Sequence, residues 1–181
     1  MKINIFGSTG VIGRKTLEII DKNFPNLKIN LICAKSNINL LKKQILIYKP
    51  VYAFLHDIEK YNYSNMQIGK TKLLNYNELQ SYLNTSKSDL SLLAISGYKS
   101  LYYLENIIKN TDNLGIVSKE AIVSAGHIFK KKKYFEKTKI FPIDSEHFSL
   151  FETFQKIKFK ANINKVILTA SGGPFYKKKF N

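Results

Sequence analysis

The sequence is poor in cysteine and in long apolar runs. Cys33 is the single cysteine among 181 residues, which excludes a disulfide framework and favours a reducing compartment. No apolar stretch reaches the length of a membrane span, and the first residues read as a strand rather than as a signal peptide. We therefore expect a cytoplasmic protein without a membrane partner, and we interpret Cys33 as a small buried hydrophobe.

Arginine is also scarce, although the formal net charge is +16. Arg14 is the only arginine, whereas base reading and bidentate phosphate binding favour arginine over lysine. The lysines are scattered among abundant Asn, Ile, Tyr and Phe, which is typical of AT-rich coding. We therefore expect no nucleic-acid partner. A basic nucleic-acid-binding protein stays as an alternative, and its affinity would fall steeply with salt.

Apolar runs typical of strands alternate with segments of helical spacing along most of the chain. Strands are expected at 3–6, 28–33, 52–56, 90–95, 114–117, 139–143 and 166–169. Helices are expected at 16–23, 38–48, 76–83, 99–108, 120–129 and 149–157. The polar segment 62–72 reads as a loop or a short edge strand. This alternation predicts an α/β fold: a Rossmann-like, doubly wound, mostly parallel sheet with helices on both faces and ligands at the carboxyl ends of its strands.

A glycine-rich stretch, GSTGVIG at residues 7–13, lies between the first strand and the first helix. Such a turn gathers free backbone N–H groups and the positive end of the helix dipole, which suits a pyrophosphate. The spacing of Gly7, Gly10 and Gly13 is one residue wider at the front than the GxGxxG fingerprint. Gly10 suits close approach of a phosphate, and Gly13 suits close packing of helix on strand. The alternative is that these glycines serve only a tight turn.

The end of the second strand carries no carboxylate, although an acidic residue there would select NAD. Lys35, Ser36 and Asn37 stand in its place and suit a 2′-phosphate through charge and hydrogen bonding. NADP is therefore favoured over NAD. In the alternative interpretation, Lys35 is one more surface lysine, and Ser36 and Asn37 cap the next helix.

Two further polar groups follow strand-like runs. Asp144 and Glu146 are two residues apart, and extended backbone would direct both carboxylates to one side, which suits Mg²⁺ or Mn²⁺. His147 beside them is more often structural than a ligand. Ser171 precedes two glycines in a turn that suits an anion such as a substrate phosphate. Solvated carboxylates and an irregular glycine turn are the alternatives.

Five motifs occur in the order GSTGVIG, AKSN, SKEAIVSAG, PIDSEH and LTASGGPF, and together they resemble the 1-deoxy-D-xylulose 5-phosphate reductoisomerase family of the non-mevalonate isoprenoid pathway. The resemblance implies an NADPH-binding domain at 1–145 and the truncated beginning of an α+β catalytic domain at 146–181. It also implies an oxidoreductase that uses NADPH and Mg²⁺ or Mn²⁺. Its small-molecule substrate would be the ketose phosphate 1-deoxy-D-xylulose 5-phosphate, converted to 2-C-methyl-D-erythritol 4-phosphate.

The resemblance also implies roles for single residues. Together with Gly7, the cofactor-binding residues would be Thr9, Gly10, Val11, Ile12, Lys35, Ser36, Asn37, Ser118 and Glu120. Lys119 and Glu146 would be catalytic, the substrate would contact Lys119, Ser145, Glu146 and Ser171, and the metal would be held by Asp144 and Glu146. Val11 stands where the family commonly has serine, and Ser118 where it usually has asparagine, so a cofactor contact is expected to differ at each position.

In the family, the third metal carboxylate, a substrate-binding histidine and the active-site lid follow the SGGPF segment and lie beyond this sequence. We therefore hypothesise that the isolated 181-residue chain binds Mg²⁺ weakly and does not turn over. The alternatives are a non-catalytic NADP-binding fragment, one half of a split enzyme, and a different NADP-dependent reductase without a metal requirement. Two protein partners stay open: a second copy in a homodimer, or a C-terminal chain that completes the site.

Overall fold

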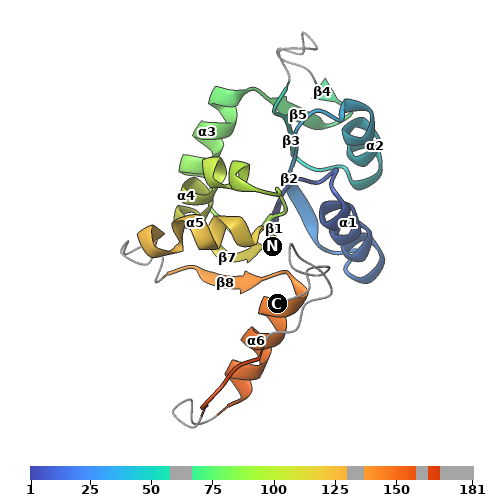
Figure 1. Ribbon diagram of the computed structural model, residues 1–181. Helices are drawn as coiled ribbons and strands as arrows, with labels where there is room; N and C mark the ends of the chain where they lie inside the picture. The colour runs from blue at the N-terminus through green and yellow to red at the C-terminus, as the bar shows by residue number, and fades with distance from the viewer. Residues whose placement is uncertain (58–66, 130–136, 158–162, 168–181) are drawn as a thin grey trace, which may run out of the picture.

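A mostly parallel sheet forms the centre of the computed structural model, which describes residues 1–57, 67–129, 137–157 and 163–167 (Figure 1). The strands are β1 (Lys2–Phe6), β2 (Lys28–Ala34), β3 (Tyr52–Leu55), β4 (Gln67–Ile68), β5 (Thr71–Leu74), β6 (Ser88–Leu93), β7 (Thr111–Ile116) and β8 (Lys139–Pro142). Their order in the sheet is β4-β5-β3-β2-β1-β6-β7-β8. Neighbouring strands pair in parallel except β4 and β5, which pair antiparallel.

Helices cover both faces of this sheet. The α-helices in the described residues are α1 (Val11–Asn23), α2 (Ile38–Tyr48), α3 (Tyr76–Thr85), α4 (Leu101–Lys109) after a short 3₁₀ turn (Tyr98–Ser100), α5 (Lys119–Phe129) and α6 (Ser145–Lys156), and α6 extends away from the sheet (Figure 1). Helices α1 and α2 lie on one face, and α3, α4 and α5 lie on the other (Figure 1). The expected α/β, doubly wound architecture is therefore confirmed.

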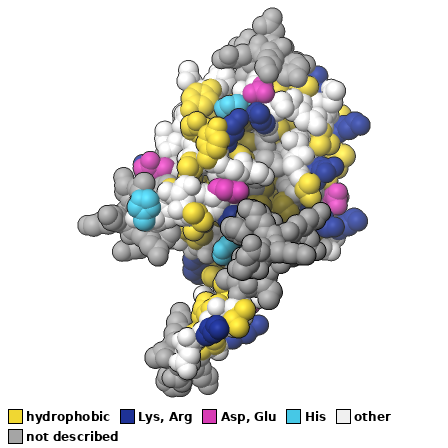
Figure 2. Space-filling model, in the orientation of Figure 1, with side chains coloured by type: hydrophobic (Ala, Val, Ile, Leu, Met, Phe, Trp, Pro, Cys, Tyr) yellow, Lys and Arg dark blue, Asp and Glu magenta, His cyan; other side chains and the backbone are white. Residues whose placement is uncertain are grey.

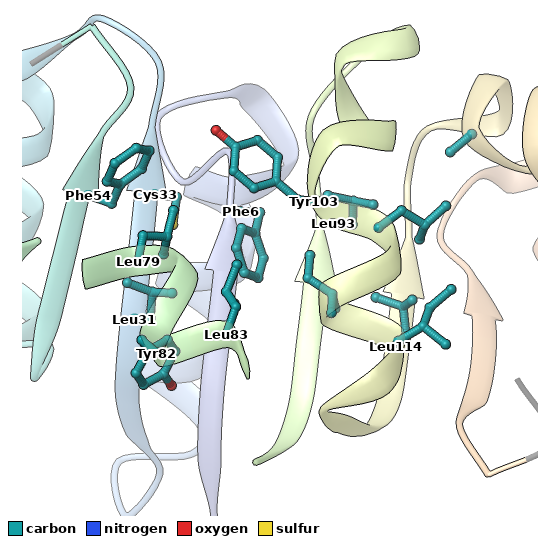
Figure 3. Close-up of a cluster of buried hydrophobic side chains, with 14 of the residues drawn as sticks. Phe6, Leu31, Cys33, Phe54, Leu79, Tyr82, Leu83, Leu93, Tyr103 and Leu114 are labelled. Atoms are coloured by element: carbon teal, nitrogen blue, oxygen red, sulfur yellow. The ribbon is translucent and has the colours of Figure 1, made fainter. Parts of the chain in front are cut away.

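Each face of the sheet has its own apolar core, and β2 shows how one strand supplies both. Leu31 and Cys33 belong to the cluster under α3, α4 and α5 (Figure 3), whereas Ile32 and Ala34 belong to the cluster under α1 and α2. Successive side chains of a strand point to opposite faces, so a run of four buried residues is needed where both faces are covered. Cys33 is buried and free, as the sequence predicted, and burial raises the pKa of its thiol.

The strand order places the reversal of the chain between β1 and β6. From β1 the chain builds outward through β2 and β3, and it then returns to add β6, β7 and β8 on the other side. In open parallel sheets, ligands bind outside the carboxyl ends of the strands at such a switch point. The glycine stretch that follows β1 therefore lies where a doubly wound sheet binds its ligand.

Three expectations about the elements need correction. Strand β5 contains only four residues and was not expected, and it is held by pairing with β3 and β4 on both sides. Helices α1 and α6 begin five and four residues earlier than the apolar spacing indicated, at Val11 and Ser145, because their first turns are exposed and carry no apolar periodicity. Val166 and Ile167 are in no strand and are exposed; residues 168 and 169 of that run lie outside the described residues.

The polar segment before β5 supplies the expected short edge strand at Gln67–Ile68, which ends the sheet next to β5. In the described ranges, none of the helices combines the length and apolar character needed to cross a bilayer. The domain boundary expected between residues 145 and 146 stays a prediction.

Candidate cofactor and metal site

The turn after β1 is built so closely that only glycine fits at two of its positions. Gly7 has φ +87°, and a Cβ there would lie 2.4 Å from the carbonyl oxygen of Ala94 at the end of β6. A Cβ on Gly13 would lie 2.2 Å from the carbonyl oxygen of Gly7. Gly13 therefore allows α1 to pack directly on the turn, as the sequence indicated.

Gly10 is the N-cap residue of α1, and no side chain caps this helix. The first turn of α1 also contains no acidic residue. Because α1 begins at Val11, the backbone N–H groups of Val11 and Ile12 belong to the first turn, where a helix has no internal acceptors for them. Both side chains are exposed, and Thr9 beside them is half-buried. The start of α1 thus has the uncapped amides and the dipole end that suit an anion.

The β2–α2 connection carries the three residues expected to face a 2′-phosphate. Lys35, Ser36 and Asn37 are all exposed. The side chain of Asn37 accepts a hydrogen bond of 3.0 Å from the backbone N–H of Leu40 and is the N-cap of α2. The capping alternative is therefore correct for the Asn37 side chain. Lys35 and Ser36 lie at the carboxyl end of β2, next to the end of β1.

Ser118 follows β7, and its hydroxyl contacts the backbone of Gly97 in the segment that follows β6. Its side chain is buried, and its hydroxyl donates to Glu120 Oε2 at 2.8 Å and contacts the carbonyl oxygen of Gly97 at 3.3 Å. The backbone N–H of Glu120 and the Ser118 hydroxyl lower the pKa of the Glu120 carboxyl. Glu120 is therefore an anion held at the carboxyl edge of the sheet, and Ser118 fixes its position rather than offering a free hydroxyl.

Asp144 is the N-cap of helix α6, and Glu146 lies in its first turn. The expectation from the sequence that both carboxylates lie on extended backbone is therefore wrong. The Asp144 carboxylate accepts from the backbone N–H of His147 at 2.9 Å, and both of its oxygens lie 2.8 Å from His147 Nδ1. Burial opposes ionisation of Asp144, but these contacts and the charges of His147 and Lys119 hold its pKa below the usual range. His147 has a structural contact here, as expected, and it contacts a candidate metal ligand.

Glu146 lies in the first turn of α6, and the Ser145 hydroxyl donates to its Oε2 at 2.8 Å. This hydrogen bond and the backbone N–H of Glu146 lower its pKa, and Lys119 acts in the same direction. Burial and the negative charge of Asp144 raise it. The two carboxylates are thus close enough to repel each other, although the helix turn rather than an extended strand brings them together.

Lys119, at the start of α5, is the link between these groups. Its ammonium charge lowers the pKa of both Asp144 and Glu146. A pocket of about 310 Å³ opens beside it between α5, β8 and the start of α6. It is lined by Ile116, Ser118, Lys119, Ile122, Val123, Ile140, Pro142, Asp144 and His147. The structure therefore brings Lys119, Asp144 and Glu146 together; Ser171 lies outside the described residues.

The donor set fits a hard divalent cation in part. Two ionised carboxylates that repel each other supply the oxygen ligands and the negative charge that Mg²⁺ or Mn²⁺ requires. In the part of the chain that the structure describes, no group of three or more His, Cys, Asp or Glu side chains is placed to hold a metal. A cation here would take its remaining ligands from water or from other groups.

Sequence reasoning did not single out Ser8 or Gln44. Ser8 lies inside the glycine turn with its whole side chain buried, and Gln44 lies on the buried face of α2. The sequence pattern could have indicated Gln44, because this polar residue lies on the same helix face as the apolar residues Leu41 and Ile45. A polar residue at a core position of a helix needs a buried hydrogen-bonding partner.

Comparison with protein families gives two matches in chain order. Residues 3–126 match the family 1-deoxy-D-xylulose 5-phosphate reductoisomerase, and residues 140–181 match its C-terminal domain. The reductoisomerase of Pelagibacter ubique is 38% identical over 180 residues, covering 96% of this chain and 46% of its own length. The chain spans about half the length of the curated relatives that it matches.

Solved structures share the fold. The reductoisomerase from Zymomonas mobilis in complex with NADPH superposes with a TM-score of 0.69 at 23% identity, covering 81% of this chain and 39% of that one. A DOX-P reductoisomerase in complex with NADPH, fosmidomycin and magnesium gives a TM-score of 0.66 at 23% identity, covering 81% and 37%. The family match over residues 3–126, in a sheet that has this fold, shows that the chain belongs to the 1-deoxy-D-xylulose 5-phosphate reductoisomerase family.

Proposed function

We propose that this chain supplies the NADPH-binding part and the lysine–carboxylate part of a site that converts 1-deoxy-D-xylulose 5-phosphate to 2-C-methyl-D-erythritol 4-phosphate. One observation carries the proposal. Lys119, Asp144 and Glu146 interact electrostatically at the carboxyl ends of β7 and β8, on the same edge of the sheet as the glycine turn after β1. A reductase needs its hydride donor and its carbonyl-binding groups on one edge, and this topology supports the proposal because both candidate regions follow carboxyl ends of parallel strands.

The pyrophosphate of NADPH would lie on the turn of Gly7, Thr9 and Gly10 and on the first amides of α1, at Val11 and Ile12. The uncapped start of α1, which carries no acidic residue in its first turn, supports this assignment. Lys35 and the Ser36 hydroxyl would bind the 2′-phosphate by charge and hydrogen bonding. Asn37 would contribute through its backbone, because its side chain caps α2. Ser118 would act by holding Glu120 toward the cofactor.

The metal would be held by Asp144 and Glu146. Lys119 would place its positive charge beside the substrate oxygens, where negative charge develops during the reaction. The Ser145 hydroxyl donates to Glu146 in this structure and would donate to the substrate instead when the substrate is bound. Ser171 is proposed as a further substrate contact. When bound, the cation would polarise the substrate oxygens and NADPH would supply the hydride. The pocket beside Lys119 would shield apolar parts of the ligands from water.

The cofactor assignment is tested by calorimetric titration of the intact chain with NADPH and with NADH. We expect NADPH to bind at least about tenfold more tightly, since the 2′-phosphate gains charge-assisted hydrogen bonds. Lys35→Glu should abolish this preference. Lys28→Glu, a matched change at the amino end of the same strand, should leave it intact. Equal affinities for NADPH and NADH in the unmodified chain would contradict the assignment.

The metal assignment is tested by titrating the chain with Mn²⁺ and recording its electron paramagnetic resonance signal. Asp144→Asn and Glu146→Gln should each weaken binding by about tenfold or more, because each removes one charged ligand. Glu152→Gln, farther along α6, is the matched control and should have no effect. Loss of binding in the control alone, or in none of the variants, would refute the assignment.

Turnover by the isolated chain is a separate question. Asp144 and Glu146 are both engaged by neighbours on their own helix, and this observation favours NADPH binding without catalysis as the second candidate function. Consumption of NADPH by the isolated chain with the ketose phosphate and Mg²⁺ would establish turnover and reject that candidate. NADPH binding without consumption would support it, and addition of a C-terminal chain from a relative would then test whether a second polypeptide restores turnover.

A further inference from the structure

Ser8, inside the glycine turn, is held by hydrogen bonds to two other elements. It is completely buried, and all three of its polar groups are hydrogen-bonded. Its backbone N–H donates to the carbonyl oxygen of Cys33 in β2 at 2.9 Å. Its hydroxyl donates to Gln44 Oε1 at 2.8 Å, and its carbonyl oxygen accepts from Gln44 Nε2 at 2.8 Å. Strand β2 and helix α2 therefore hold the turn from two directions.

Gln44 forms this pair from a core position. Its side chain is 3% exposed and lies two turns beyond Asn37, the N-cap of α2, on the face that also buries Leu41 and Ile45. A buried amide is stable only with its partners in place, so the reciprocal pair fixes both its own orientation and that of the Ser8 peptide. The chain continues through Thr9 and Gly10 to Val11 and Ile12, whose amides are assigned to the pyrophosphate.

We propose that Gln44 is a positioning residue for the cofactor: its reciprocal hydrogen bonds with Ser8 hold the turn in the conformation that binds the pyrophosphate. This inference rests on the proposed NADPH function. Gln44 itself touches no ligand, and it acts by removing the conformational freedom that the turn would otherwise lose on binding. Helix α2 thereby ties the turn to Lys35 and Ser36, so that the two anion-binding groups of one dinucleotide keep a fixed spacing.

The test compares Gln44→Met and Ser8→Ala with a matched control, Asn110→Ala. Gln44→Met removes both hydrogen bonds at nearly constant volume, and Ser8→Ala removes only the hydroxyl bond. Asn110 also donates a hydrogen bond, to the carbonyl oxygen of Leu83 at 2.6 Å, and this bond is partly buried. Asn110 directly precedes β7 and thus lies at the amino ends of the strands, opposite to the turn. All three variants remove internal hydrogen bonds, and only the first two touch the turn.

Two probes are titrated calorimetrically into each variant: NADPH, and adenosine 2′-monophosphate, which lacks the pyrophosphate. Gln44→Met should weaken NADPH binding by about tenfold and Ser8→Ala by about threefold, with less than about twofold change for adenosine 2′-monophosphate. Hydrogen exchange without ligand should accelerate in residues 7–13 of Gln44→Met and stay unchanged in β7. Asn110→Ala should lower the melting temperature and leave the affinity for NADPH unchanged.

Three results would overturn the inference. The first is an unchanged affinity for NADPH in Gln44→Met and Ser8→Ala. The second is equal weakening of both probes, and the third is equal weakening of NADPH binding in Asn110→Ala; either would reveal a general loss of stability. If Gln44→Met does not fold, Ser8→Ala alone decides between these results. Failure of the unmodified chain to bind NADPH would refute the proposed function, whereas binding that the variants leave intact refutes only the role of Gln44.

Discussion

The turn after β1 and the start of α6 both present polar groups at the same edge of the sheet, but they are held in different ways. Contacts from distant parts of the chain fix the turn: Ser8 bonds to Cys33 and Gln44, and Gly7 packs against Ala94. At the start of α6, in the part of the chain that the structure describes, the side-chain hydrogen bonds of Asp144, Ser145 and His147 join residues at most three positions apart.

Burial separates the two regions as well. Helix α1 buries Gly13, Leu17 and Ile20, whereas α6 buries no residue and projects from the sheet (Figure 1). It contacts β8 through an edge-on contact of Phe141 with Phe151, at 5.6 Å between ring centroids. Phe148 of α6 is exposed, and hydrophobic side chains are visible on the lower extension of the molecule that contains α6 (Figure 2). The tertiary structure therefore preorganises the turn after β1, while the carboxylates depend on one helix end for their position.

The largest effect is expected from Gly13→Ala. Its Cβ would meet the Gly7 carbonyl oxygen at 2.2 Å, and backbone on both sides cannot give way. We expect a loss of about 3 kcal/mol or more in the free energy of unfolding and loss of NADPH binding. Gly126→Ala in α5 is the matched control, because its nearest contact is a methyl group at 3.6 Å. It should stabilise the chain by up to about 1 kcal/mol. Urea unfolding of both variants measures the difference; equal stabilities would show that the turn is not closely packed.

Removing helix caps should change stability less than Gly13→Ala does. The effect should differ between α3, which buries residues in the core, and α6, which buries none. Asn75→Ala removes the capping box of α3, which buries Leu79 and Leu83, so global stability should fall by about 1 kcal/mol. Asp144→Ala removes the cap of α6, which has no buried residue. The global unfolding transition should then stay unchanged while hydrogen exchange accelerates in α6. A matching loss of global stability in Asp144→Ala would mean that α6 is part of the cooperative unit.

Lowering the pH into the acid range should destabilise the start of α6 locally, as measured by hydrogen exchange. The pKa of Asp144 is lower in the folded chain than in an unfolded one. The stability that its carboxylate gives to the start of α6 is therefore complete above the ordinary aspartate pKa of about 3.9, and it disappears as the pH falls through the folded pKa. Hydrogen exchange of residues 145–148, corrected for intrinsic rates, should accelerate in that window. Asp144→Asn keeps a capping side chain without a titrating group and should flatten the profile. A profile unchanged by that substitution would assign the effect to other carboxyls.

The smallest effect is expected at Val11, which stands at the first position of α1 and is 72% exposed. Val11→Ser would add a hydroxyl beside the amides assigned to the pyrophosphate and should tighten NADPH binding by about threefold. Val123→Ser, at an exposed position of α5, is the matched control and should change nothing. Weaker binding in Val11→Ser would indicate that the Val11 side chain itself packs against the cofactor.

The sequence by itself determined the layers of this protein and the family to which it belongs. A run of four apolar residues, such as Leu31 to Ala34, predicts a strand that is covered on both faces, because such a strand has no alternation of polar and apolar residues. Glycine spacing indicated the turn, since a left-handed φ and a close approach of backbone leave no other residue type. Boundaries were less readable: Val11 and Ser145 begin helices whose first turns are solvent-exposed.

The tertiary structure alone decided how the polar groups combine. Asn37 and Asp144 became helix caps because their neighbours turn into helices, and no spacing distinguishes a cap from a ligand. The proximity of Lys119 to Asp144 and Glu146 depends on β7 and β8 being neighbours, which is a long-range pairing. The bond between Ser8 and Gln44 joins residues 36 positions apart. Local patterns report local backbone preferences, whereas contacts between distant residues arise only when the chain packs into one sheet.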